Sequence, residues 1–239
     1  KHWGTVKATQ RLIELCNISS GQYVLDIGCG TGYTACLLAK DYRVGVVAAD
    51  IRSKVLGKAK KRIAKEGVGE RVKTIEADVH ELPFPSNTFD AVIAESVLAF
   101  CDSAKVAREV YRVLKPRGFF GNNEGTYLTP PPAELLSFLL KSYGLDIKLL
   151  QEGEWRAVYG AAGFEVVSLT VYPFNYREQF LGELRVDGIR RRLSAWSKAF
   201  FDPTVRRTIL TATDRDTRQR LRQFLSHVGY GLYVARKVG

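Results

Sequence analysis

The sequence is poor in the residues from which metal sites and disulfides are built. It has four cysteines and three histidines among 239 residues, and no methionine. The cysteines form no CxxC pair, whereas zinc sites and disulfide frameworks need paired, closely spaced ligands. We therefore expect no metal site, and buried reduced thiols at Cys16, Cys29, Cys36 and Cys101.

Long hydrophobic runs are also absent. No apolar stretch approaches the ~18–20 residues that a membrane helix needs, and residues 1–4 do not begin a secretory signal peptide. The composition, with 46% hydrophobic and 26% charged residues, is typical of a globular protein. The sequence therefore predicts a cytoplasmic protein of one or two domains without a transmembrane segment.

The charge is strongly positive, with a net value of +11. Such a charge favours anionic partners in general. Nucleic-acid binding would in addition need a recognisable module or a continuous basic face, and neither is evident in the sequence. Nucleic acid is therefore the disfavoured partner.

Apolar, strand-like runs alternate with helical patterns along the first half of the chain. This alternation predicts an α/β fold with a parallel sheet and helices on both faces. Two later apolar runs fit the same scheme. The expected strands are 23–27, 44–49, 72–77, 89–94, one opened by Phe119, 164–174 and 230–235, and the expected helices include 33–42, 54–66 and 104–114.

A glycine-rich segment, VLDIGCGTG at 24–32, lies at the first strand-to-helix turn. In open parallel sheets this turn borders the ligand crevice, and glycines let the backbone approach a ligand closely. The spacing is GxGxG, whereas nicotinamide and flavin sites use GxGxxG. Asp26 precedes the first glycine by two residues and would repel a pyrophosphate. The segment therefore favours S-adenosylmethionine, which carries a sulfonium and an amino group and no phosphate.

Two more acids end the next two expected strands. A carboxylate at Asp50 can accept both hydroxyls of a ribose. Asp78 can accept from an adenine amino group while the backbone N–H of Val79 donates to a ring nitrogen. A single acid at a strand end is often only a solvated terminus or a helix cap. Acids at three successive strand ends beside a glycine loop indicate one ligand site.

Together these segments resemble class I S-adenosylmethionine-dependent methyltransferases. Within the class, the chain most resembles the small-molecule branch, which includes quinone-, tocopherol- and sterol-modifying enzymes. The resemblance covers residues 21 to about 125 well and 164–174 acceptably. It rests on VLDIGCGTG at 24–32, the acid at 50, AD at 77–78, LPF at 82–84, FDAV at 89–92 and LKPRG at 114–118, where the usual form is LKPGG.

The resemblance implies a Rossmann-like, seven-stranded, mostly parallel sheet whose last strand is antiparallel. It implies S-adenosyl-L-methionine as cofactor, S-adenosyl-L-homocysteine as product, and a small-molecule acceptor. Asp26 and the glycines would line the methionine end, Asp50 the ribose and Asp78 the adenine. The full expected cofactor set is Asp26, Gly28, Cys29, Gly30, Gly32, Asp50, Ile51, Asp78, Val79 and Glu95.

The acceptor side is less defined. The fourth strand ends in Ala94-Glu95-Ser96, without the Asn- or Asp-Pro-Pro-aromatic motif that accompanies amide or adenine acceptors in this class. Glu95 could take a proton from the acceptor or only hold the ligand. With Glu124, after the fifth strand, it forms the predicted catalytic pair. Tyr127 and His80 are weaker candidates, and Trp3 lies on a segment that often folds over the cofactor in this class.

Residues 175–228 form an expected helical insertion before the last strand, so that 1–174 and 229–239 make up the core. Ile189, Leu193, Trp196 and Phe200 share one helical face. The segment holds 12 Lys+Arg and 6 Asp+Glu, and thus contributes +6 of the +11. We interpret it as a lid over an anionic acceptor, or over a lipophilic one held at a negatively charged membrane surface. The alternative is a helical addition to the sheet edge with solvated arginines such as Arg190, Arg191, Arg192, Arg206 and Arg207.

Other functions stay open at this point. They are a nucleic-acid methyltransferase, a non-catalytic S-adenosylmethionine-binding module and a nicotinamide oxidoreductase. The acceptor atom and the oligomeric state are not indicated by the sequence.

Overall fold

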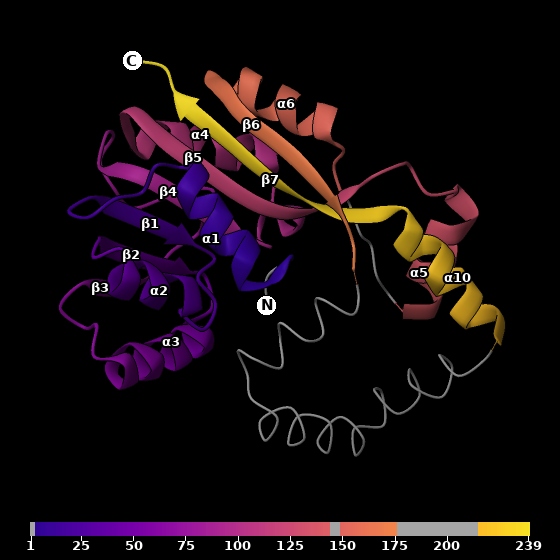
Figure 1. Cartoon of the computed structure of the whole chain (residues 1–239), viewed down its shortest axis with the longest axis horizontal. Helices are drawn as coiled ribbons and strands as arrows, with labels where there is room; N and C mark the ends of the chain where they lie inside the picture. Colours follow the sequence, from indigo (N-terminus) through magenta and orange to yellow (C-terminus); the bar gives the residue numbers. More distant parts are fainter. Residues whose placement is uncertain (1–2, 144–148, 176–214) are drawn as a thin grey trace.

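The computed structural model describes residues 3–143, 149–175 and 215–239. A seven-stranded sheet forms its centre, in the order β3-β2-β1-β4-β5-β7-β6 (Figure 1). All neighbours pair in parallel except β7, which is antiparallel to both β5 and β6. The strands are β1 (Tyr23–Ile27), β2 (Gly45–Asp50), β3 (Val72–Glu76), β4 (Phe89–Glu95), β5 (Leu114–Tyr127), β6 (Phe164–Pro173) and β7 (Val228–Lys237).

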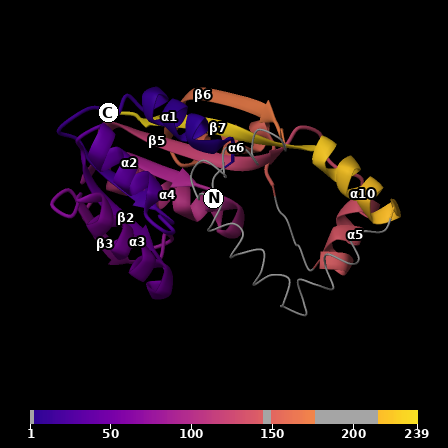
Figure 2. The same cartoon turned by 60° about the horizontal axis from the view of Figure 1, so that its bottom comes forward.

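Helices cover both faces of the sheet (Figure 2). One core cluster joins α1, α2 and α3 to one face, and a second joins α4 and α6 to the other. In the second cluster Trp155 and Tyr159 are almost completely buried, each contributing several kcal/mol through the ~25 cal/mol gained per Å² of apolar surface. The helices are α1 (Thr5–Leu15), α2 (Tyr33–Asp41), α3 (Ser53–Glu66), the short 3₁₀ turn η1 (Leu98–Phe100), α4 (Ser103–Val113), α5 (Ala133–Tyr143), α6 (Glu152–Ala161) and α10 (Arg215–Ser226).

This architecture confirms the predicted fold: a mostly parallel, Rossmann-like sheet of seven strands with an antiparallel last strand. The largest difference in a strand boundary is at β5, which begins at Leu114 and not at Phe119. The pairing with β4 shifts register between Phe89 and Ala91, so residues 115–118 bulge out of the ladder. Patterns of apolar residues do not reveal this bulge, because Lys115, Pro116 and Arg117 are not buried and Gly118 has no side chain.

The bulge places Arg117 in the left-handed region at φ 65°. This is the position at which the usual motif has glycine, and a side chain there costs roughly 1–2 kcal/mol. Replacing the exposed Arg117 with glycine should raise the free energy of unfolding by about 0.5–1 kcal/mol, after the entropic cost of glycine. Arg117→Ala removes the same charge but keeps Cβ, and should change stability by less than ~0.5 kcal/mol. Equal urea midpoints for the two variants would contradict this explanation.

Part of the predicted insertion lies within the described residues. Phe224 of α10 is buried against Leu135 of α5 and Val228, whereas Leu225 is exposed. The two helices lie side by side in both views (Figures 1 and 2). The core strand β7 already begins at Val228, one residue before the expected boundary at 229. The predicted helical face at Ile189, Leu193, Trp196 and Phe200 and the arginines at 190–192 and 206–207 lie outside the described residues.

None of the helices in the described ranges is long and apolar enough to cross a membrane. The same ranges hold no group of three or more His, Cys, Asp and Glu side chains arranged to bind a metal ion. All four cysteines are free thiols.

Candidate active site

The glycine loop after β1 lets a ligand and a neighbouring helix approach its backbone closely. Gly28, Gly30 and Gly32 all have positive φ, at 64°, 56° and 73°. A Cβ on Gly32 would lie 3.1 Å from the Cβ of Ala59, so this glycine lets the loop pack on α3. A Cβ on Gly30 would find only the Gly28 oxygen, 3.9 Å away. Gly30 therefore presents bare backbone to the outside of the loop, where a ligand can lie against it.

Asp50, at the end of β2, ties this loop to the sheet. Its Oδ2 accepts from the Gly30 backbone N–H at 3.0 Å, and its Oδ1 accepts from the backbone N–H and Nε of Arg52 at 3.0 and 3.2 Å. Oδ2 retains a lone pair that can accept from a ribose hydroxyl. The neighbouring Ile51 is 61% exposed, an apolar surface that an adenine ring can cover.

Asp26, in β1, is the least compensated polar group of the site. It is 2% exposed, and its Oδ2 has no hydrogen-bond partner within the described part of the chain. Burial raises the pKa of Asp26, and the nearby Glu95 raises it further, while the backbone N–H of Ala35 lowers it. A buried carboxylate without a partner is costly unless a ligand compensates it.

Four acids are buried at this edge of the sheet: Asp26, Asp50, Glu95 and Glu124. Arg52, whose side chain is 66% exposed, pairs with Asp50. Asp26 Oδ2 has no hydrogen-bond partner within the described residues, so this part of the site suits a ligand that brings positive charge. The sulfonium and amino group of S-adenosylmethionine fit the acids at 26 and 95, and its ribose fits Asp50.

Glu95 is held from three directions. Thr9 of α1 donates to its Oε1 at 2.8 Å, Thr34 of α2 donates to its Oε2 at 2.7 Å, and Asn123 Nδ2 lies 3.4 Å from Oε1. Asn123 Nδ2 also donates to the backbone oxygen of Trp3 at 2.9 Å. These bonds link the N-terminal segment, the first turn of α2 and β5. They favour the holding role of Glu95 over proton abstraction.

The side chain of Glu124 lies on the face of the sheet opposite to that of Glu95. Glu95 pairs with Asn123, and successive residues of a strand point in opposite directions. Its carboxylate accepts from the backbone N–H of Ala99, in the turn that follows β4, at 3.3 Å. It also accepts from the backbone N–H of Gly125, in β5, at 3.0 Å. Burial raises the pKa of Glu124, although these backbone donors oppose the shift. The structure therefore does not bring the two predicted catalytic acids together.

Asp78 follows β3 and is half exposed, with its pKa lowered by bonds from His80. The backbone N–H and Nδ1 of His80 both reach Oδ1, at 2.9 and 2.7 Å. Asp102 donates its backbone N–H to His80 Nε2 at 3.1 Å, so Nδ1 carries the proton. With both ring nitrogens engaged, His80 orients Asp78 and is a poor candidate for the base. Val79 is buried beside it.

Cys29 contributes backbone and not thiol chemistry. Its N–H donates to the Ala49 oxygen at 2.9 Å, which fixes the loop on β2. Burial raises the pKa of the Cys29 thiol, and Asp26 and Asp50 raise it further, so the thiolate that would react does not form at neutral pH.

Comparison with known proteins agrees with this geometry. Residues 25–121 match a family model described as a methyltransferase domain. The chain is 37% identical over 166 residues to the uncharacterized methyltransferase YodH of Bacillus subtilis, which covers 69% of each protein. The chain belongs to the class I S-adenosylmethionine-dependent methyltransferases.

Other relatives of this methyltransferase carry an acceptor in their names. The 27-O-demethylrifamycin SV methyltransferase of Amycolatopsis mediterranei is 33% identical over 197 residues, covering 82% of this chain and 67% of that protein. A sterol 24-C-methyltransferase of Pneumocystis carinii is 30% identical over 156 residues, covering 63% and 41%. Among solved structures, the MccD protein superposes with a TM-score of 0.76 at 19% identity, over 97% of this chain and 96% of that one, which shows the common fold.

These findings confirm the predicted family, enzyme class and cofactor. The sequence missed the groups that hold Glu95. Thr9 lies 86 residues away from it in the chain, and nothing in its local sequence distinguishes it. Asn123 had a signal, because it belongs to an unusually polar strand end. No signal in the sequence marked Ser96. In the structure it adopts φ 59°, and its Oγ is buried without a hydrogen-bond partner in the described ranges.

Proposed function

We propose that this methyltransferase transfers the methyl group of S-adenosylmethionine to a small, predominantly apolar acceptor. The observation that carries the proposal is the buried acidic interior around the glycine loop, with Asp26 Oδ2 unpartnered among the described residues. Bound S-adenosylmethionine supplies an activated methyl group on a positively charged sulfur. The relatives named for a sterol and a rifamycin acceptor support the apolar class.

In this proposal each residue of the site has a binding or orienting role. The ligand lies against the bare backbone of Gly30, and Asp50 accepts hydrogen bonds from the ribose. Asp78 and the backbone N–H of Val79 form hydrogen bonds with the adenine, which lies on Ile51. Orientation of the two reactants is worth ~7–11 kcal/mol of the barrier in well-aligned cases. Exclusion of water helps as well, because positive charge disperses when a neutral nucleophile attacks the methyl carbon.

The remaining parts of the proposal are the location and the lid. A cytoplasmic location is supported by the four cysteines, all of them free thiols. The lid role of the insertion at 175–228 is supported by α10, which packs on α5 beside Trp3 and Tyr127. Contact of its basic residues with a membrane surface is a further part of this proposal.

The cofactor assignment is tested by calorimetry. Wild type should bind S-adenosylmethionine and S-adenosylhomocysteine, and should not bind a nicotinamide dinucleotide. Asp50→Ala removes an acceptor for the ribose and the tie to Gly30, and should weaken binding by ~1–3 kcal/mol, or roughly five- to 150-fold. The matched control is Asp90→Ala, an acid at the opposite end of the sheet that pairs with Lys115. Equal affinity in the two variants would reject the ribose assignment.

Transfer itself is tested with isotopically labelled S-adenosylmethionine. The assay offers a set of sterols, macrolides and hydroxylated aromatics, together with an RNA pool, and the products are identified by mass spectrometry. Label in a small apolar product supports the proposal. Label in RNA alone would reject it.

A further inference from the structure

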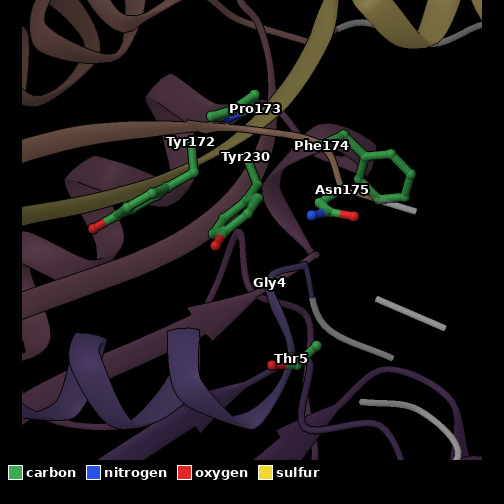
Figure 3. A pocket seen from close by; sticks show the side chains of 7 residues that line it. All are labelled: Gly4, Thr5, Tyr172, Pro173, Phe174, Asn175 and Tyr230. Carbon is green, nitrogen blue, oxygen red and sulfur yellow. The ribbon is translucent and has the colours of Figure 1, made fainter. Parts of the chain in front are cut away.

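A pocket of about 230 Å³ lies beside the start of α1, at the end of β6 and the start of β7 (Figure 3). Three of its walls are the aromatic rings of Tyr172, Phe174 and Tyr230. None of the described residues that line it carries a charge. These residues are Gly4, Thr5, Tyr172, Pro173, Phe174, Asn175 and Tyr230.

The aromatic wall is fixed by backbone pairing. Tyr172 and Tyr230 are direct partners in the β6–β7 ladder, and their rings stack with centroids 5.1 Å apart and planes at 20°. Gly4 lies under the Tyr230 ring, because a Cβ there would approach within 2.4 Å of it. The stacking of the two rings and the close approach of Gly4 to Tyr230 favour this arrangement of the aromatic wall.

The pocket is connected to the proposed methyl-transfer site through Trp3. Phe174 contacts the Trp3 ring edge-on, with centroids 5.5 Å apart. The Trp3 backbone oxygen accepts from Asn123, which also contacts Glu95. The Trp3 ring in turn packs on Gly125, where a Cβ would lie 2.9 Å from it. Three contacts, through Trp3 and Asn123, therefore connect Phe174 in the aromatic pocket to the buried Glu95.

We propose that this pocket binds an uncharged ring system of the acceptor, which deepens and rests on the proposed function. Aromatic walls favour flat rings through offset and edge contacts worth ~0.5–1.5 kcal/mol per pair. A charged group would lose its hydration here, and the described lining offers it no partner of opposite charge. The size agrees, since a cavity of about 150 Å³ holds one benzene, and this pocket has room for a fused pair of rings.

Binding of 2-naphthol, followed by ligand-observed NMR and calorimetry, tests the proposal. The protein is saturated with S-adenosylhomocysteine so that the probe cannot enter the adenine site. Naphthalene-2-sulfonate has the same rings with a charge, and 1-octanol is neutral without a ring. We expect 2-naphthol to bind more tightly than both. Tyr172→Leu and Tyr230→Leu should each weaken it roughly two- to tenfold, while Tyr23→Leu, in a stacked pair with Phe89 in another part of the sheet, should not.

The outcomes separate the two proposals. Unchanged 2-naphthol affinity in Tyr172→Leu with unchanged S-adenosylhomocysteine affinity would overturn the pocket assignment, as would equal binding of the sulfonate or of octanol. Unchanged S-adenosylhomocysteine affinity also shows that each variant is folded. If wild type binds 2-naphthol with this variant pattern but does not bind S-adenosylhomocysteine, the pocket assignment holds and the proposed cofactor function fails.

Discussion

Asp26→Asn should stabilise the apoprotein and abolish tight cofactor binding. The substitution removes an acid that the apoprotein must either ionise in a buried site near Glu95 or keep protonated above its ordinary pKa, and it leaves Oδ1 available to the backbone N–H of Ala35. We expect the free energy of unfolding at pH 8 to rise by about 1–2 kcal/mol, a gain of the size found when a strained functional group is removed. Affinity for S-adenosylmethionine should fall at least tenfold, because the positively charged ligand loses its buried counter-charge.

The sign of the pH dependence follows from the raised pKa of Asp26. The unfolded chain releases this proton near the ordinary value of 3.8, whereas the folded apoprotein retains it to higher pH. The contribution of Asp26 to the free energy of unfolding is therefore fully present below its unfolded pKa and is lost as the pH rises toward its folded pKa. Wild type should show a more negative slope of unfolding free energy against pH than Asp26→Asn over that window.

The affinity for the cofactor should change with pH in the opposite direction to the stability of the apoprotein. A cationic ligand stabilises the carboxylate, so binding expels the proton and affinity rises with pH. Calorimetry in two buffers of different ionisation enthalpy measures the number of protons released. A wild type that releases no proton, with a pH slope equal to that of Asp26→Asn, would show that the acid at 26 is already ionised in the apoprotein.

The glycine loop and the three strand-end acids could be predicted because they are local signals. A strand, a turn and an acid at its end lie within a few residues, and parallel topology then brings the ends together. The acceptor side depends on contacts between distant segments. The pairing of Glu95 with Thr9 crosses 86 residues, and the aromatic pocket combines the start of α1 with β6 and β7.

The contrast between Glu95 and Glu124 shows a second limit. The sequence predicted that Glu95 ends one strand, that Glu124 follows the next, and that both face the sulfonium methyl. In the structure Glu95 ends β4, whereas β5 continues to Tyr127 and includes Glu124. Their direction depends on the register of β4 against β5, which pairs Glu95 with Asn123 and sends Glu124 to the other face. The register follows from a bulge at 115–118 that the apolar pattern does not reveal.

Glu95→Ala should cost about 2–4 kcal/mol of stability and weaken cofactor binding. The change leaves the hydroxyl donors of Thr9 and Thr34 and the amide of Asn123 facing a cavity, and each buried donor without an acceptor costs ~1–3 kcal/mol when the site cannot relax. Because Thr34 lies in the first turn of α2, just after the glycine loop, this loss should also loosen the loop. Urea unfolding and calorimetry with S-adenosylhomocysteine measure the two effects.

Glu95→Gln decides between the holding and the proton-accepting role. Gln keeps an oxygen for Thr9 and Asn123, and its amide can donate to the Thr34 hydroxyl after that hydroxyl rotates. If Glu95 holds the site, Gln should stay within about 1 kcal/mol of wild type in stability and should keep most of the turnover. If Glu95 is the base, Gln should lose ~10²–10⁴-fold in turnover at unchanged cofactor affinity. Glu165→Ala, which removes an exposed partner of Arg236, is the control for loss of an acid and should cost less than ~1 kcal/mol.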